Sequence, residues 1–339
     1  MQSGAPRGRV VSPDAAKGLA HRHCERLIAA VSADYLGPRQ VVEFSVAALL
    51  ARGHLLLEDV PGVGKTTLAR SLAGALGLKV ARVQCTPDLL PSDVIGYSLP
   101  LSGDLTFRPG PIFSNVVLVD EINRAAPRTQ SAFLEAMEEH QVTAEGETRP
   151  LPRPFFVIAT QNPIEIAGTY PLPESQLDRF HLRLRLGYPA RGAELTLLQR
   201  ADPRNGSGDP RNGSGDPRNG SGGGAVLGLN DLEQLWAAVG EVACSDSLLQ
   251  YLIEVGAASR QHASLRIGIS PRGLLNWKDL GRAVAFVRGR DFVLPDDLLD
   301  LAPAALAHRL LPNVEHRGLV ALDPQEILEE ILKTVPLPL

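Results

Sequence analysis

A short glycine-rich stretch, LEDVPGVGKTTLA at residues 57–69, holds the residue types that bind a triphosphate. It comes close to the phosphate-binding pattern G-x-x-x-x-G-K-[ST], because the second glycine, the lysine and the hydroxyl are Gly64, Lys65 and Thr66. Asp59 stands where the first glycine is usual. Since Asp also adopts turn geometry, the loop can still form if this carboxylate points away from the phosphates. We therefore predict a nucleotide site; the alternative is a glycine-rich turn with an unrelated lysine.

Each position of this loop has a physical role. Gly62 and Gly64 supply unusual backbone angles, so that consecutive N–H groups form an anion-binding nest at the start of a helix. We expect Lys65 to reach the β- and γ-phosphates of ATP and the Thr66 hydroxyl to bind Mg²⁺. The nucleotide-binding residues predicted along the loop are Pro61, Gly62, Val63, Gly64, Lys65, Thr66 and Thr67.

Two further apolar stretches end in polar side chains. NVVLVDE (115–121) ends in Asp120 and Glu121, and side chains at the carboxyl ends of parallel strands face the ligand crevice. We predict that Asp120 holds Mg²⁺ and that Glu121 activates the water that attacks the γ-phosphate. FFVIATQNP ends near Asn162, whose amide can hold that water from the other side; the alternative is that Asn-Pro starts a loop.

Two arginines lie at predicted boundaries between secondary-structure elements. Arg179 in PESQLDRF separates a short helix from a strand, where it could reach the ATP of a neighbouring subunit. Beyond it, His181, Arg183 and Arg185 alternate with leucines and are expected to form a solvated or subunit-facing edge.

Arg272 in ISPRGLL lies in the first turn of a predicted helix. A cation there opposes the helix dipole, which costs a few tenths of a kcal/mol to about 1 kcal/mol. A bound phosphate would offset this cost; the alternative is an ordinary surface arginine.

The elements that must position these residues alternate along the first 190 residues. Helical patterns cover 18–51, with a break at YLGPRQ, and KTTLARSLAGALG after the loop. Predicted strands are HLLLE (54–58), KVARVQ (79–84), NVVLVDE (115–121), FFVIATQN (155–162) and RLRLGY (183–188). Because strands alternate with helices, we predict an α/β fold with a parallel sheet covered on both faces.

After residue 190 the pattern changes. Residues 202–222 repeat DPRNGSG three times without an apolar residue, which predicts a flexible tether through 224. The rest is expected to be all helical, with starts at Ser245 or Asp246, at Ser270 with Pro271, and at Asp323 with Pro324. The predicted helices are LNDLEQLWAAV, SDSLLQYLIEVGAASRQ, SPRGLLNWKDLGRAVAFVRG, LPDDLLDLAPAALAHRL and PQEILEEILKTV.

Composition excludes several classes. The 339 residues carry a net charge of -4 with 44% hydrophobic residues, so neither nucleic acid nor an anionic membrane is an expected partner. The N-terminus has no apolar signal region, and no window approaches the roughly 18 apolar residues of a membrane span. Three widely spaced cysteines, Cys24, Cys85 and Cys244, are expected to be reduced thiols of a cytoplasmic protein.

With these residues set out, the chain resembles the MoxR family of AAA+ ATPases over about residues 20–200 and 225–335. The stretches that carry the resemblance are HLLLEDVPGVGKTTLA, CTPDLLPSDVIGYS, FRPGPIFSNVVLVDEINRAAPRTQSAFLEAMEEHQVT, FFVIATQNPIEIAGTYPLPESQLDRF and GISPRG. EDVPGVGKT is a usual form of the loop in that family. The resemblance implies a P-loop αβα core with a parallel sheet, followed by a small all-helical lid.

The resemblance also implies roles. Lys65 and Thr66 match the Walker A residues, Asp120 and Glu121 the Walker B pair, Asn162 sensor 1, Arg179 an arginine finger acting in trans, and Arg272 sensor 2. Leu36 and Gly37 stand where the family contacts adenine, although Pro38 departs from its usual pattern. Residues 97–110 and 141–153 match two inserts that would line a ring pore.

The expected division is a disordered tail at 1–17, an ATPase core at 18–190 and a helical lid at 191–339, interrupted by the linker at 202–224. The resemblance implies ATP and Mg²⁺ as cofactors and a homo-oligomeric ring, which we expect to be a hexamer. It further implies chaperone-like remodelling of a protein client with a von Willebrand factor A domain protein as adaptor. The alternatives are a nucleic-acid motor of a related branch and an ATP-gated scaffold with little turnover.

Overall fold

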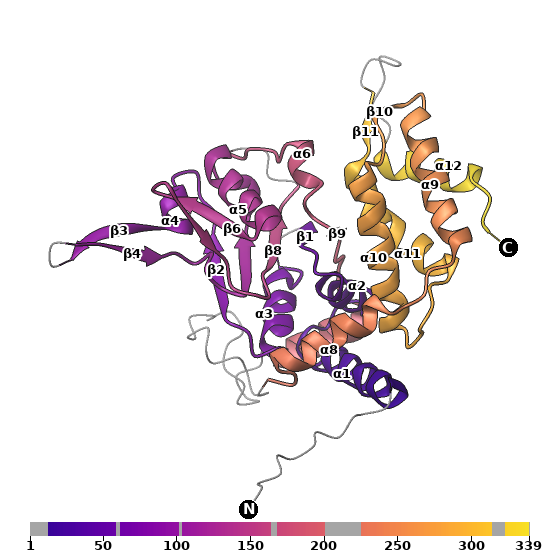
Figure 1. The fold of residues 1–339 in the computed structure, drawn as a ribbon, viewed down its shortest axis with the longest axis horizontal. Coiled ribbons are helices and arrows are strands. Elements are labelled where there is room, and N and C mark those ends of the chain that lie inside the picture. The colour runs from indigo at the N-terminus through magenta and orange to yellow at the C-terminus, as the bar shows by residue number, and fades with distance from the viewer. Residues whose placement is uncertain are drawn as a thin grey trace, which may run out of the picture.

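A computed structural model describes residues 13–58, 62–101, 104–163, 168–200, 225–313 and 323–338. A parallel sheet covered by helices forms one part of the molecule, and a group of helices from the C-terminal third forms the other (Figure 1). The predicted α/β class is confirmed.

The sheet has five strands in the order β2-β5-β8-β1-β9, and all neighbours are parallel. The strands are β1 (Leu55–Glu58), β2 (Val80–Gln84), β5 (Val116–Asp120), β8 (Phe156–Gln161) and β9 (Leu182–Leu184). Every residue of β1 and β5 is buried, as the apolar runs predicted for strands covered on both faces. β9 ends at Leu184, earlier than predicted, because its pairing with β1 stops at Leu57 and Gly187 then turns the chain with φ +68°.

Helices cover the two faces of the sheet. Alternate strand residues point to opposite faces, so Leu55 and Leu57 belong to one hydrophobic cluster and Leu56 to the other. The first cluster includes α1 (Pro13–Asp34), α2 (Arg39–Leu50) and α3 (Lys65–Ala75). The second includes α4 (Pro91–Ile95) and α5 (Pro127–Glu139). Three short elements complete this part: η1 (Ile122–Arg124), α6 (Glu174–Leu177) and α7 (Arg191–Arg200).

Two antiparallel hairpins extend from this core. β3 (Gly96–Leu101) pairs with β4 (Asp104–Pro109), and this hairpin projects far from the sheet (Figure 1). β6 (Gln141–Ala144) pairs with β7 (Glu147–Pro150) within the insert expected at residues 141–153.

The C-terminal part consists mainly of helices that begin where their capping residues predict. Ser245, Ser270 and Asp323 each accept a hydrogen bond from a backbone N–H in the first turn of α9, α10 and α12. The elements are α8 (Leu229–Gly240), α9 (Asp246–Gln261), β10 (Leu265–Ile267), α10 (Pro271–Val287), α11 (Pro295–Leu306), η3 (Ala307–Arg309), β11 (Leu311–Pro312) and α12 (Pro324–Thr334). The expectation of an all-helical unit was wrong in one place: β10 and β11 form a short antiparallel pair. Pairing satisfies backbone groups where two connecting segments lie side by side.

The helical part packs on the first two helices of the chain. One continuous hydrophobic cluster joins α1 and α2 to α8, α10 and α11. At its margin the indole Nε1 of Trp236 donates a hydrogen bond to the carbonyl oxygen of Leu49 over 3.1 Å. The helical part is therefore attached to the core through α1 and α2 as well as through the chain.

Several predictions fall outside the described residues: the roles of Asp59 and Pro61, the DPRNGSG repeat and most of the expected tail. α1 already begins at Pro13, within the stretch 1–17 assigned to a tail, since proline is tolerated in the first turn of a helix. The remaining domain limits stay predictions. Among the described helices, none combines the length and the apolar character needed to cross a membrane.

Candidate nucleotide site and arginine pair

The phosphate loop has the backbone that its glycines predict. Gly62 and Gly64 have φ angles of +90° and +95°, a region that favours glycine. Gly64 caps α3, and Lys65 is the first helical residue, so the positive end of α3 points into the loop. Val63 is buried beneath the loop, whereas Thr66 is half-buried and Thr67 exposed.

Lys65 lies across the end of a neighbouring strand. Its Nζ is 3.4 Å from the carbonyl oxygen of Gln161, the last residue of β8. A phosphate that enters the loop would meet this ammonium group at the carboxyl edge of the sheet.

The segment between α1 and α2 lies against the same loop. A Cβ placed on Gly64 would be 3.4 Å from the buried ring of Tyr35. A Cβ on Gly37 would overlap that ring at 2.2 Å, so a larger residue there would displace Tyr35. The structure thus places Tyr35 and the half-buried Leu36 and Gly37 beside the phosphate loop, where contacts to a nucleotide base were predicted.

Asp120 ends β5 as a buried carboxylate that already has a cation. The Nε of Arg82 on β2 donates to its Oδ2 over 2.6 Å, and the hydroxyl of Thr160 donates to its Oδ1 over 3.4 Å. Sequence reasoning missed Arg82. The available signal for it was that Arg82 and Gln84 lie two residues apart, and so on the same face, near the end of a predicted strand.

Glu121 adopts a strained backbone for a non-glycine residue, with φ +57° and ψ +51°. Its N–H donates to the Thr160 hydroxyl over 2.9 Å. Its Oε2 accepts from Gln84 Nε2 at 3.1 Å and lies 3.2 Å from Arg124 Nε. The turn after β5 therefore separates two adjacent carboxylates: Arg82 binds Asp120, while Gln84 and Arg124 hold Glu121.

Asn162 is buried just beyond the end of β8. Its carbonyl oxygen accepts from Asn123 Nδ2 over 3.5 Å. Since β8 lies between β5 and β1, Asn162 comes between the Asp120–Glu121 pair and the phosphate loop. The structure brings these predicted residues together at the carboxyl edge of three adjacent strands.

The donor set at this edge suits Mg²⁺. Thr66 offers a hydroxyl in the first turn of α3, and Asp120 offers a carboxylate, which are the hard oxygen ligands that Mg²⁺ prefers. Arg82 binds Oδ2 of Asp120, and the other carboxylate oxygen, Oδ1, lies next to the Thr160 hydroxyl. The residues present therefore fit this ion.

Arg179 and Arg272 meet elsewhere, on one carboxylate. Arg179 Nε donates to Glu138 Oε2 over 2.9 Å, and Arg272 Nη1 donates to Glu138 Oε1 over 2.7 Å. The two hydrogen bonds hold the pKa of the Glu138 carboxyl below its usual value. This carboxylate, supplied by the chain itself, offsets the helix dipole at Arg272, for which sequence reasoning had invoked a phosphate. The sequence offered no signal for Glu138.

This arginine pair lies at the amino edge of the sheet. Glu138 is near the end of α5, where the preceding Met137 carbonyl accepts a hydrogen bond from His54 Nε2 over 3.1 Å. His54 immediately precedes β1, whereas the phosphate loop follows its other end. At 3.2–3.4 Å per residue the four residues of β1 separate the two ends by about 13 Å. The structure therefore does not bring Arg179 and Arg272 to the phosphate loop of their own chain.

The C-terminal part holds the segment that carries Arg179. Arg309 of η3, with only 2% of its side chain exposed, donates to the carbonyl oxygens of Asp178 and Phe180 over 3.1 and 2.8 Å and pairs with the Asp178 carboxylate. His308 Nε2 donates to the same Phe180 oxygen over 3.1 Å. The residues on both sides of Arg179 are thus fixed by one element, which sequence reasoning did not detect.

The solvated or subunit-facing edge expected after Arg179 is found only in part: Arg185 has 65% of its side chain exposed, whereas His181 and Arg183 have partners within the chain. His181 packs against His54, whose N–H donates to its Nδ1 over 3.2 Å, and burial lowers the pKa of His181 to about 3. Arg183 and Arg185 approach the buried carboxylate of Glu58 at 3.1 and 3.5 Å. The reason is that β9 lies beside β1, whose last residue is this buried glutamate.

Comparisons with known proteins agree with this geometry. The family described as "ATPase family associated with various cellular activities" matches residues 54–182, and the family described as "AAA lid domain" matches residues 257–331. The chain is 44% identical to the protein YeaC of Bacillus subtilis, over 95% of this chain and 94% of that protein. It is 37% identical to the Chaperone MoxR1 of Mycobacterium tuberculosis, over 96% of this chain and 86% of that protein.

A solved structure supports the same relationship. The crystal structure of a presumed ATPase from Cytophaga hutchinsonii superposes with a TM-score of 0.83 at 34% identity. The match covers 96% of this chain and 98% of that one, so it includes the sheet and the C-terminal helices together.

Proposed function

The chain belongs to the MoxR family of AAA+ ATPases, and from this premise we propose that it hydrolyses ATP in a ring in which each site is completed by the next subunit. The observation that carries the proposal is the position of Arg179 and Arg272. Both bind Glu138 at the amino edge of the sheet, whereas the phosphate loop of the same chain leaves the carboxyl edge. Two cations so placed are suited to the nucleotide of another copy.

The carboxyl edge of the sheet supplies the residues that would bind ATP and activate the attacking water. The loop amides and Lys65 would hold the β- and γ-phosphates, and the segment at Leu36 and Gly37 would contact the base. Glu121 would accept a proton from the attacking water, and Asn162 would orient this water from β8. Thr66 and Asp120 would hold Mg²⁺, which when bound neutralises charge on the phosphates.

The arginine pair would supply the positive charge that stabilises the transition state. In a free chain both arginines pair with the Glu138 carboxylate. In an assembly the γ-phosphate of the neighbour would replace this carboxylate as their partner. Because the phosphate edge of one chain meets the arginine edge of the next, the contact is heterologous and closes into a ring when the rotation permits. We propose a hexamer as the ring.

We propose that ATP hydrolysis drives chaperone-like remodelling or maturation of protein complexes. The support is that one relative is named a chaperone. A protein client and an adaptor with a von Willebrand factor A domain are the partners that this role implies.

Steady-state turnover and nucleotide binding test the assignment together. Arg179→Ala should reduce ATP turnover by about 10³–10⁵-fold, the usual contribution of an arginine finger, and should leave ATP affinity nearly unchanged. Lys65→Ala should abolish binding and turnover alike. Titration with a fluorescent ATP analogue measures affinity, and phosphate release measures turnover. Equal loss of binding in both variants, or full turnover by Arg179→Ala, would contradict the proposal.

A further inference from the structure

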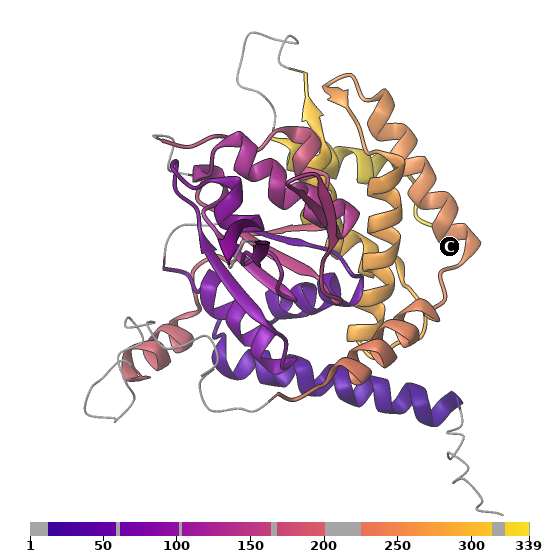
Figure 2. The ribbon, with the colours of Figure 1, turned by 60° about the vertical axis from the view of Figure 1, so that its left-hand side comes forward.

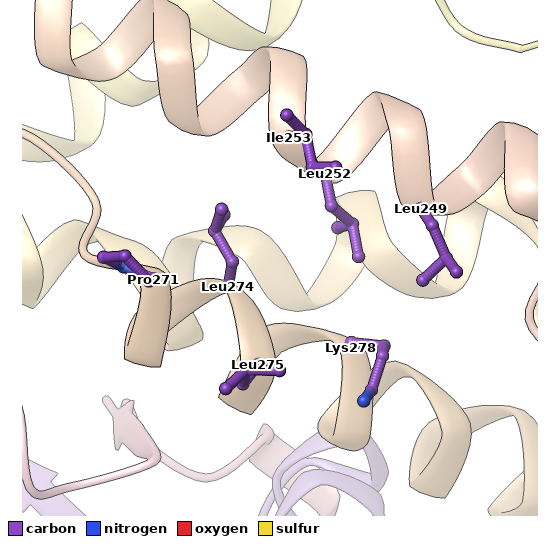
Figure 3. A pocket seen from close by; sticks show the side chains of 7 residues that line it. All are labelled: Leu249, Leu252, Ile253, Pro271, Leu274, Leu275 and Lys278. Carbon is purple, nitrogen blue, oxygen red and sulfur yellow. The ribbon is translucent and has the colours of Figure 1, made fainter.

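The C-terminal helices carry an apolar groove that begins beside the arginine pair. α9 and α10 form its walls, and its volume is about 480 Å³. Figure 3 shows Leu249 and Leu252 of α9 pointing toward α10, and Leu274 of α10 pointing toward α9. The residues that line it are Leu249, Leu252, Ile253, Pro271, Leu274, Leu275 and Lys278.

The groove exposes apolar side chains on both of its walls. Ile253 and Leu275 are 53% and 57% exposed on its two walls. Contiguous apolar surface of this kind commonly marks an interaction site. Pro271 lies at one end of the groove and directly precedes Arg272, so the groove continues the surface that bears the arginine pair.

A second apolar surface lies on α7. Leu195 and Leu198, which are 56% and 72% exposed, are three residues apart and therefore share one side of the helix. Leu197 is also exposed. Figure 2 shows α7 and the pair α9–α10 at opposite sides of the molecule, so α7 does not cover the groove of its own chain.

The topology places α7 on the phosphate side. β9 runs parallel to β1, with Leu55 opposite Leu182, so both strands end at the same edge of the sheet. The phosphate loop follows β1, and the segment that leads to α7 follows β9. A contact that joins the phosphate edge of one chain to the arginine edge of the next therefore brings α7 toward the groove.

We propose that α7 of one subunit binds in the α9–α10 groove of the adjoining copy, with Leu195 and Leu198 inserted between the two helices. This inference rests on the proposed function, which requires the same two faces to meet. Helix-in-groove binding uses apolar side chains spaced three or four residues apart on one side of the helix. The occupant of the groove is thus a second copy of this chain.

The charges at the two surfaces are complementary. Glu194 is exposed on α7, four residues before Leu198. Lys278 lines the groove and, in the single chain, pairs with Asp279 over 3.2 Å. In the complex Glu194 would lie at the rim of the groove, where it can approach this ammonium group and favour one orientation of α7.

Cross-linking between two different chains tests the contact directly. One chain carries Leu198→Cys and the other Ile253→Cys, and both carry Cys244→Ser because Cys244 is only partly buried. Cys24 and Cys85 stay, since burial raises the pKa of each thiol to about 12 and keeps it unreactive. With ATP and a short bis-maleimide, the mixture should give a covalent dimer, and neither chain alone should do so.

Charge insertion gives an independent readout. The double variant Leu195→Asp/Leu198→Asp should raise the dissociation constant of the ATP-bound ring by about 100-fold or more, since two leucines lose their burial. Leu197→Asp is the matched control, because it places a carboxylate at an exposed leucine of the same helix that does not share the side of Leu195 and Leu198. Sedimentation velocity measures assembly, and circular dichroism of the monomers checks that each variant is folded.

Three results separate the possible failures. Rings that hydrolyse ATP, form no cross-link and tolerate the double variant would overturn this inference while the proposed function stands. If Ile253→Cys reacts with maleimide equally fast in the ring and in the monomer, the groove is open in the ring and the inference is also wrong. If the parent chain neither assembles nor hydrolyses ATP, the proposed function itself fails.

Discussion

Glu121 combines an unusual backbone with two side-chain partners. Its positive φ turns the carboxylate away from Asp120, and Gln84 and Arg124 hold Oε2 at 3.1 and 3.2 Å. A general base needs a fixed direction, and this backbone together with its two partners provides one. Gln84 and Arg124 are therefore positioning residues for Glu121.

Replacement of Glu121 by Gln should separate binding from hydrolysis. Gln keeps the shape but cannot accept the proton, so we expect turnover to fall by about 10²–10⁴-fold while ATP affinity stays within a few-fold of the parent. Phosphate release and nucleotide titration measure the two quantities. Glu139→Gln, at the end of α5, is a control that removes one carboxylate from the exposed surface. Parent-like turnover by Glu121→Gln would show that the base is another group.

At the scale of single residues, sequence patterns predicted those site residues that lie at the end of a strand or at the start of a helix. Lys65, Asp120, Glu121 and Asn162 are of this kind, because loop motifs and strand ends are local features. Glu138 and Arg82 were not found, since their partners lie on other elements. Which residue faces Asp120 depends on the register of β2 against β5, which the sequence pattern alone does not fix.

At the scale of elements, buried histidines join β1, β9 and η3 below the arginine pair. His54 accepts from the Val157 N–H at Nδ1 and donates to the Met137 carbonyl oxygen from Nε2, so its ring is neutral in the folded chain. Burial lowers the pKa of His54 to about 4 and that of His181 to about 3, and it also lowers that of His308.

This cluster predicts a loss of stability in mild acid. The unfolded chain binds protons at these histidines near pH 6.5, whereas the folded chain does not until about pH 4 or below. The free energy of unfolding should therefore fall as the pH falls from about 6.5 to about 4, by up to about 1.4 kcal/mol per pH unit for each histidine.

Urea titrations at pH 7.5 and pH 5 check this slope. His181→Asn keeps an acceptor for the His54 N–H without a titrating ring, so it should lose one histidine's share of the slope. An identical slope in the parent and in His181→Asn would rule out this role for His181.

The order of strands and helices followed from apolar runs and capping residues, and the starts of α9, α10 and α12 fell at the predicted residues. The end of β9 did not, because a strand ends where its pairing stops, and the partner of β9 is distant in sequence. The β10–β11 pair escaped prediction for the same reason: each strand has too few residues to show a pattern.

At the scale of the whole molecule, the two parts are packed against each other. The helices α8, α10 and α11 share a hydrophobic cluster with α1 and α2, and Arg309 holds the segment around Arg179. A change in the orientation of the C-terminal part would therefore move the arginine pair. Sequence patterns indicated two parts but not this packing, which joins residues more than 100 positions apart.

The central claim is that the arginine pair of one chain completes the nucleotide site of the next. Mixing two inactive chains tests it most directly, with Lys65→Ala in one and Arg179→Ala in the other. In a mixed ring, some interfaces join an intact phosphate loop to an intact arginine pair, so the account predicts that ATP turnover reappears, at up to about a quarter of the parent rate for equal amounts. Mixed rings confirmed by native mass spectrometry that stay as inactive as either chain alone would contradict it.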